Sequence, residues 1–341
     1  MSKILIGLDI GTHSIKAVQI ARNKASNILM AAGFISTPIN TLNVNNSNDE
    51  KILGDSINRL VNDMKISTVE VSASLPSSRV ITHIIEVPLM SEKELSSSIQ
   101  WEAEQYIPWQ LSNVKIDYVI IDQNLDTKKM KVLIVAAPIK LIEQYMRIMT
   151  LAGLTPVAIE TEILATARAI GRCLPTLTNV LIVNIGGNGS EIALMRDHIL
   201  IFTKSLPIGG TIFTKAISEE LGFEHVQAEE YKKTYGLDSD KLEGKIAKII
   251  NPFIINLFEE IEKTIAYFKE QYQNEKVSTA VLTGGSTKLP GLVLATTKNL
   301  GLDSQICNPF SCLSVDPKIL PIITPDSPIY TTAVGLGLKE I

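Results

Sequence analysis

The sequence predicts an α/β protein of two related lobes, and three observations support this fold class. The chain has 341 residues, 45% of them hydrophobic, which is enough for about two domains with sizeable cores. Strand-like and helix-like stretches follow one another along it. Two segments, GLDIGTHSIKAV at residues 7–18 and IVNIGGNGSEIA at residues 182–193, each lead from an apolar run through a glycine turn into another apolar run. Because their offset divides the chain nearly in half, a duplicated unit is favoured over two coincidental hairpins.

Composition excludes several classes of function. The net charge is only −4 and no dense basic block occurs, which argues against a nucleic-acid partner. No apolar stretch reaches the roughly 18 residues of a membrane-spanning helix, so we expect a cytoplasmic protein. The cysteines are odd in number and lack zinc-type spacing, so we expect neither a disulfide framework nor a structural metal site; they are Cys173, Cys307 and Cys312.

The first half of the chain predicts a small unit inside the first lobe. Residues 69–88 hold two strand-like runs around the turn LPSS, and a helix follows, with Ser91 and Glu94 as its capping box and Pro108 as its end. VKIDYVII and KVLIVAAP are then strand-like, and Pro138 and Gly153 bound a second helix. Residues 78–155 therefore predict an inserted β, α, β, β, α subdomain.

The second half predicts a long helix with a regular apolar stripe, which runs from Ile254 to Tyr272. We interpret it as an internal helix rather than a coiled coil, because the stripe ends within about three heptads and leads into the strand STAVLTGG. The final AVGLGLKEI lacks the basic amphipathic pattern of a membrane anchor.

The glycine turns predict a phosphate site. Missing side chains let backbone N–H groups approach phosphate oxygens, and neighbouring hydroxyl and amino groups add donors. Asp9, just before the first turn, offers a carboxylate to Mg²⁺ through water. A simple hairpin turn would explain the first turn by itself equally well. The candidate binding residues are Gly11, Thr12, His13, Ser14 and Lys16 in the first turn, Gly186, Gly187 and Asn188 in the second, and Gly284, Gly285 and Ser286 in a third.

The three turns, in this order, resemble the phosphate-1, phosphate-2 and adenosine motifs of the actin, Hsp70 and sugar-kinase superfamily. The resemblance implies an actin-like fold of duplicated ribonuclease H-like lobes that binds ATP or ADP with Mg²⁺. The stretch PIGGTIFTKAISEELGFEHVQAEEYKKTYG resembles the superfamily segment that reaches ribose and adenine. It adds Gly209 and Gly210, and places Glu229 and Lys232 three residues apart on one helix face. A solvated helix surface remains the alternative for these last two.

Longer stretches narrow the resemblance. The inserted subdomain looks like that of the cell-division protein FtsA, and SLPSSRVITHIIEVPLMSEKELSSSIQWEAEQYIPW, LTGGSTKLPGL and CNPFSCL resemble the type IV pilus assembly PilM family over nearly the whole chain. This implies a first lobe of residues 1–77 and 156–179, an inserted subdomain of residues 78–155 that binds the partner, and a second lobe of residues 180–341. It also implies a protein at the cytoplasmic face of the inner membrane, held there only through partners. These would be the N-terminal tail of PilN, the pilus platform and its motor ATPases.

The sequence departs from the superfamily pattern in the second turn. Asn184 stands where an aspartate is usual and Gly189 where a hydroxyl is common, so the Mg²⁺ ligand there is only a carbonyl oxygen. Hydrolysis should suffer more than binding, because it depends on charge that organises metal and water. Glu160 is the candidate for positioning water, although a glutamate that favours the helix dipole is an equal alternative. We expect slow or absent turnover.

The two tryptophans predict the partner surface. Trp101 and Trp109 are close in sequence, and Trp101 lies off the apolar stripe of its helix, which makes it a candidate protein contact. Packing against a neighbouring lobe is the alternative. Three other functions stay open: an FtsA-like division protein, an adaptor of a type II secretion or competence system, and a small-molecule kinase.

Overall fold

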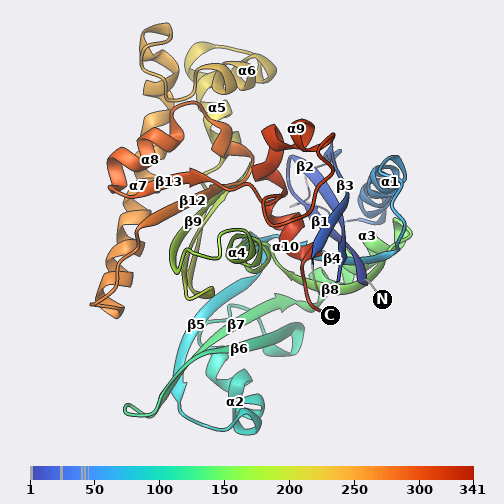
Figure 1. The fold of residues 1–341 in the computed structure, drawn as a ribbon, viewed down its shortest axis with the longest axis vertical. Helices are drawn as coiled ribbons and strands as arrows, with labels where there is room; N and C mark the ends of the chain where they lie inside the picture. Colours follow the sequence, from blue (N-terminus) through green and yellow to red (C-terminus); the bar gives the residue numbers. More distant parts are fainter. Residues whose placement is uncertain (1–2, 24–25, 40, 42–43, 45) are drawn as a thin grey trace.

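The computed structural model describes residues 3–23, 26–39, 41, 44 and 46–341, and it contains two five-stranded sheets with the same topology (Figure 1). In each sheet three antiparallel strands are followed by two parallel ones, which confirms the duplicated two-lobed fold. The first sheet has the order β3-β2-β1-β4-β8, with β1 Lys3–Ile10, β2 Ser14–Arg22, β3 Asn27–Ser36, β4 Glu70–Leu75 and β8 Thr155–Thr161. The second has the order β11-β10-β9-β12-β13, with β9 Asn179–Ile185, β10 Ser190–Arg196, β11 Ile199–Leu206, β12 Thr279–Thr283 and β13 Asp303–Ile306.

Two helices cover one face of the first sheet. α1 (Ser47–Asp63) begins at Asn46, whose side chain accepts a hydrogen bond from the backbone N–H of Asp49. α3 (Ile139–Leu151) packs against α1 and shares its core, which contains Leu53, Ile57, Leu141 and Tyr145. A helix expected in the inserted subdomain thus packs in the first lobe, and we end the inserted unit at Pro138 instead of residue 155.

The inserted subdomain is a three-stranded antiparallel sheet with one helix, at the lower end of the molecule in Figure 1. The strands are β5 (Ile81–Pro88), β7 (Lys129–Pro138) and β6 (Val114–Asn124), with short 3-10 turns η2 (Ser77–Arg79) and η3 (Leu111–Asn113). α2 (Glu92–Glu104) has the predicted capping box and buries Leu95, Ile99 and Ala103 against the sheet. Residues of the opposite face, including Leu133, pack against the second lobe.

The second lobe is built around α7 (Lys245–Gln271), whose apolar stripe lies in the main core of the lobe. Ile254, Leu257, Phe258, Ile261 and Phe268 are buried, so the interpretation as an internal helix is confirmed. The other elements of the lobe are α5 (Gly210–Leu221), α6 (His225–Tyr235), η4 (Leu242–Gly244), η5 (Gly285–Lys288) and α8 (Leu292–Leu300).

The chain crosses between the lobes twice, and the two crossings pair at the centre of Figure 1. α4 (Glu162–Cys173) leads from β8 to β9, and the segment after β13 returns to the first lobe through α9 (Leu320–Ile323), η6 (Thr324–Tyr330) and α10 (Thr331–Gly337). The expected second lobe of residues 180–341 is therefore too long at its C-terminal end.

Glycines allow α10 to pack closely. A Cβ on Gly335 would lie 1.8 Å from the Ala165 oxygen, and one on Gly7 would lie 2.0 Å from the Ala333 oxygen. The AVGLGL stretch thus serves packing against α4 and β1. Among the helices of the described residues, none has the length and apolar character needed to cross a bilayer.

Candidate functional site

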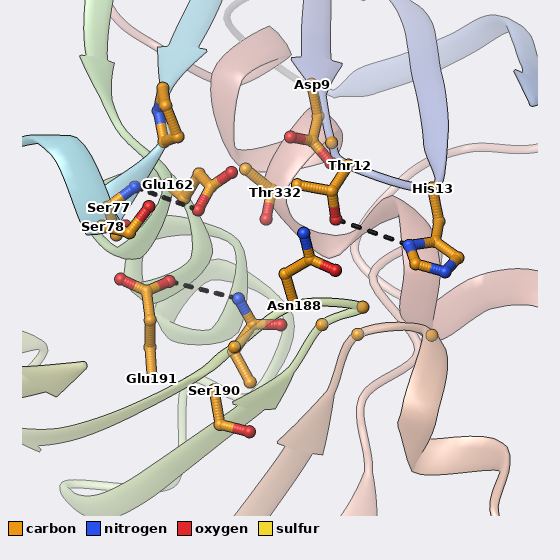
Figure 2. Close-up of a pocket in the computed structure, with 18 of the residues that line it drawn as sticks. Asp9, Thr12, His13, Ser77, Ser78, Glu162, Asn188, Ser190, Glu191 and Thr332 are labelled. Atoms are coloured by element: carbon orange, nitrogen blue, oxygen red, sulfur yellow. Dashed lines mark hydrogen bonds between the residues drawn. The ribbon is translucent and has the colours of Figure 1, made fainter. Parts of the chain in front are cut away.

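The glycine turns of both lobes surround one cavity of about 530 Å³ (Figure 2). The antiparallel hairpins β1–β2 and β9–β10 meet there, each with a tight turn in which the backbone N–H of Gly11 or Gly186 donates to a carbonyl three residues on. The cavity is lined by Asp9, Gly11, Thr12, His13, Ser14 and Lys16 from the first hairpin, by Asn184 and residues 186–191 from the second, and by Pro76, Ser77, Ser78, Glu162, Ser205, Leu206, Pro207, Gly284, Gly285, Pro328, Ile329 and Thr332.

The first hairpin places Asp9 at the wall of the cavity. Asp9 and Lys16 are cross-strand partners, and Lys16 Nζ donates to Asp9 Oδ2 at 3.0 Å. The Ser74 hydroxyl donates to Asp9 Oδ1 at 3.2 Å. Asp9 thus enters the cavity as an oriented carboxylate with a partner cation beside it.

The second and third turns lie in close contact. A Cβ on Gly284 would lie 2.6 Å from Asn184 Oδ1, and Gly284 has φ +90°, which side chains rarely adopt. A Cβ on Gly209 would lie 2.4 Å from the Gly187 oxygen, and the Ser286 hydroxyl donates to the Gly186 oxygen at 3.0 Å. Glycine at these positions lets three loops meet at one wall of the cavity.

His13 of the first lobe contacts the second lobe. A Cβ on Gly187 would lie 2.3 Å from His13 Nδ1, and His13 Nε2 lies 3.4 Å from Thr211 Oγ1 at the start of α5. Burial lowers the pKa of His13, and the charge of Glu229 opposes this shift. The His13 imidazole, whose neutral form burial favours, therefore lies at the cavity in contact with both the second turn and α5.

Two glutamates that the sequence reasoning missed line the same cavity. The backbone N–H of Ser77 donates to Glu162 Oε2 at 3.3 Å, and Asn184 Nδ2 donates to Glu191 Oε2 at 3.2 Å. Burial raises the pKa of both carboxyls, and the charge of Asp9 adds to each shift. Figure 2 shows them at one side of the cavity, with Ser77 and Ser78 beside them. Two acidic groups with raised pKa values thus face the cavity between the two hairpins.

Comparison with known proteins identifies the family. The family model for type IV pilus assembly protein PilM matches residues 7–341. The chain belongs to the PilM family. A solved structure of a PilM–PilN type IV pilus biogenesis complex is 26% identical, with a TM-score of 0.86 over 98% of this chain and 97% of that one.

More distant relatives share the actin-like fold of this PilM-family protein. The cell-division protein FtsA of Pseudomonas aeruginosa is 25% identical over 185 residues, and that of Escherichia coli K12 is 24% identical over 183 residues. These matches cover 47% and 46% of this chain and 42% of each relative. MreB5 of Spiroplasma citri bound to AMPPNP has a TM-score of 0.52 at 15% identity, over 98% of this chain and 94% of that one, and shows the fold alone.

Glu160, the sequence candidate for positioning water, does not line the cavity of this PilM-family protein. Arg168 donates to its two carboxylate oxygens at 2.5 and 2.6 Å, and Lys339 donates to one of them at 2.9 Å. Burial raises the pKa of Glu160, but these hydrogen bonds outweigh it and the pKa is lowered. Glu160 therefore joins α4 to the C-terminal segment, while Glu162, two positions later in the same stretch, faces the cavity.

Glu229 and Lys232 lie behind the Gly209–Gly210 loop and do not line the cavity. Lys232 Nζ donates to Glu229 at 2.6 Å, to the Gly210 oxygen at 3.1 Å and to Thr214 at 2.9 Å. Lys232 is buried, so the alternative of a solvated surface is wrong for this residue. The pair supports the Gly209–Gly210 loop from α6.

The two tryptophans differ in environment. Trp101 is 74% exposed and lies off the buried stripe of α2, as its helical position predicts. Trp109 is partly buried and packs against the small core of the inserted subdomain. Trp101 is therefore available to a partner, whereas Trp109 also stabilises the subdomain.

Proposed function

We propose that this PilM-family protein binds ATP or ADP between its lobes and acts as an adaptor at the cytoplasmic face of the inner-membrane pilus platform, where it holds the N-terminal tail of PilN. Family membership over residues 7–341 supports the adaptor role. The single observation that carries nucleotide binding is the convergence of three glycine turns from two lobes on one cavity.

The chemistry of the turns supports phosphate binding. Gly11, Gly186 and Gly187 carry no side chain of their own, so a phosphate can come close to the backbone of both turns. The N–H groups of Gly11 and Gly186 are already paired within the turns, so the donors to an anion would come from other groups of the two turns. A nucleotide would place its phosphates between the two hairpins.

Mg²⁺ would be held chiefly by Asp9. The described residues hold no group of three or more histidine, cysteine or acidic side chains fit to bind a metal ion, which favours a mostly hydrated ion that accompanies the phosphates. The Asn184 amide nitrogen donates to Glu191 and its oxygen faces Gly284, so it adds little to the site. Bound there, Mg²⁺ would neutralise phosphate charge.

Slow hydrolysis is part of the proposal. Glu162 and Glu191 line the cavity where an attacking water would lie, and burial raises the pKa of both, which lowers the carboxylate fraction able to accept a proton from that water. Asn184 is neutral where superfamily members usually have an aspartate, so the expected Mg²⁺ site carries one negative charge less. Phosphate release from purified protein at about 1 per second or faster would contradict this reading.

Nucleotide binding is tested by isothermal titration of the full chain with ADP and Mg²⁺. Gly284→Ala should abolish measurable binding, because the new Cβ meets Asn184 and the Ile185 backbone at a strained φ. Gly171→Ala is the matched control, since a Cβ there meets nothing closer than 3.5 Å. If wild type and Gly284→Ala bind ADP with equal affinity, the nucleotide does not bind in the cavity beside Gly284.

The partner role is tested with a synthetic peptide of the PilN N-terminal tail. Trp101→Ala should weaken binding by about 2 kcal/mol or more if Trp101 is an anchor of that interface, and the wild-type tryptophan fluorescence should change on titration. Val226→Ala, at a residue 71% exposed on α6 in the second lobe, is the control for loss of an exposed apolar side chain. If Trp101→Ala binds the peptide with unchanged affinity, Trp101 is not part of the partner surface.

A further inference from the structure

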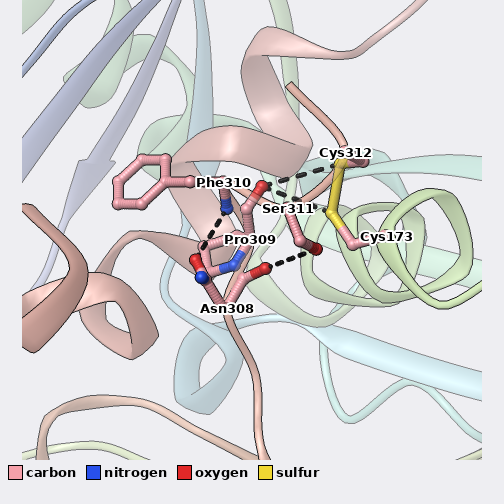
Figure 3. Close-up of a disulfide and its surroundings, with 6 residues drawn as sticks. All are labelled: Cys173, Asn308, Pro309, Phe310, Ser311 and Cys312. Carbon is pink, nitrogen blue, oxygen red and sulfur yellow. Dashed lines mark hydrogen bonds between the residues drawn. A yellow bond between two sulfur atoms is a disulfide. The ribbon is translucent and has the colours of Figure 1, made fainter. Parts of the chain in front are cut away.

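The two crossings between the lobes are covalently joined by a disulfide between Cys173 and Cys312 (Figure 3). Cys173 is the last residue of α4, and Cys312 lies in the loop that returns the chain from β13 to the first lobe. The two residues are 139 positions apart, yet their Cα atoms lie 4.5 Å apart. The expectation that the cysteines form no disulfide is therefore wrong, because only the return of the C-terminal segment brings them together.

The paired crossings connect this disulfide to the nucleotide cavity. At one end of α4 lies Glu162 and at the other lies Cys173. α4 is bound to α10 along its length: Thr166 and Thr332 share a hydrogen bond at 2.9 Å, and Arg168 donates to the Gly335 oxygen at 2.8 Å. Glu162 and Thr332 both line the cavity. The disulfide thus ties the far end of α4, whose near end forms part of the cavity wall, to the loop that leads back to the first lobe.

The surroundings suit both oxidation states of the pair. Cys173 and Cys312 are each partly exposed, so a small disulfide reagent can reach them. The Pro309 oxygen lies 3.3 Å from Cys173 Sγ and 3.6 Å from Cys312 Sγ, and accepts a hydrogen bond from either when it is a thiol. Cys307, by contrast, is 1% exposed, and burial raises its pKa to about 12. Exchange chemistry is therefore confined to one pair.

We propose that Cys173 and Cys312 form a reversible thiol–disulfide site that controls nucleotide release. The thiolate of one cysteine attacks a low-molecular-weight disulfide such as oxidised glutathione, forms a mixed disulfide and expels one glutathione thiolate. The second cysteine thiolate attacks the protein sulfur of that bond and expels the other. Two protons leave the cysteines, the protein dithiol is oxidised, and the glutathione disulfide is reduced to two thiols.

Oxidation has a mechanical consequence at the lobes. Opening the cavity requires the two lobes to rotate about the segments that cross between them. A covalent bond between α4 and the returning segment limits their relative movement. The oxidised protein should hold its nucleotide longer than the reduced one. This inference rests on the proposed nucleotide binding.

The experiment compares full-length protein equilibrated with oxidised glutathione or with dithiothreitol. Non-reducing peptide mapping by mass spectrometry measures the Cys173–Cys312 bond. A fluorescent ADP analogue is preloaded and chased with excess ATP in a stopped-flow instrument. We expect oxidation to slow release by about fivefold or more, the lower range for coupled sites. Cys173→Ser and Cys312→Ser should each remove the redox response, while Cys307→Ala should keep it.

Three outcomes would overturn the inference: equal release rates with the bond fully formed, no bond after equilibration with oxidised glutathione, or unchanged hydrogen exchange on oxidation. Hydrogen exchange of residues 162–173 and 331–337 without nucleotide gives a second readout, and oxidation should slow it. If the protein binds no analogue, the proposed nucleotide function fails, but unchanged hydrogen exchange would still overturn the redox site by itself.

Discussion

Replacing Gly187 with alanine tests whether the two lobes close on one ligand. The new Cβ would lie 2.3 Å from His13 Nδ1, 2.8 Å from Cε1 and 3.0 Å from Cγ. Cβ atoms do not approach other atoms within 3.0 Å, so the His13 ring or the second turn must move. Overpacking of this kind costs about 1–3 kcal/mol, which weakens binding by roughly 5- to 150-fold.

The structure also predicts how that loss is reversed. His13→Ala removes the ring from the space that the new methyl group needs, so the double variant Gly187→Ala, His13→Ala should bind ADP about as tightly as His13→Ala does. Isothermal titration of the four proteins gives the coupling free energy. If Gly187→Ala binds like wild type, or if His13→Ala does not rescue it, the contact between the lobes at His13 is not the cause.

Three further predictions concern the carboxylates. Asn184→Asp should raise Mg²⁺-dependent phosphate release at least about tenfold, and an unchanged rate would show that this residue does not limit turnover. Glu160→Ala leaves Arg168 without its carboxylate and should lower the free energy of unfolding by about 3 kcal/mol, measured in urea, without changing ADP affinity; loss of affinity with unchanged stability would contradict this. The raised pKa values of Glu162 and Glu191 stabilise the fold below the ordinary carboxyl value of 4.5, and this is lost as pH rises through the folded-state values. The double variant Glu162→Gln, Glu191→Gln should therefore have a higher melting temperature than wild type at pH 9 but not at pH 4.5. An equal rise in melting temperature at both pH values would contradict the raised pKa values of the two carboxyls.

Much of the fold could be predicted from the sequence because the patterns that mark its turns and helices are local. A glycine turn between two apolar runs marks a hairpin, and the Ser91–Glu94 capping box marks the start of α2. The stripe of α7 follows the helical period and lies in the core. Each of these patterns depends on backbone geometry within a few residues, which neighbours in space do not alter.

The different roles of Glu160 and Glu162 depend on where strand β8 ends and helix α4 begins. Glu160 is in strand β8 and Glu162 is the first residue of α4, so the two side chains leave the backbone in different directions. One is held by Arg168 and Lys339, and the other faces the cavity. The helix boundary and the path of the C-terminal segment decide which is which, and neither is visible in the VAIETEI stretch itself.

The two related lobes, the three glycine turns and the asparagine at position 184 in place of an aspartate could all be predicted from the sequence. Tertiary packing was needed to show that α3 packs in the first lobe, that the chain returns to this lobe after Cys307, and that Cys173 meets Cys312. The reason is physical: turns and helix starts are set by neighbours along the chain, whereas the partners of a buried charge or a cysteine are set by which distant surfaces pack together.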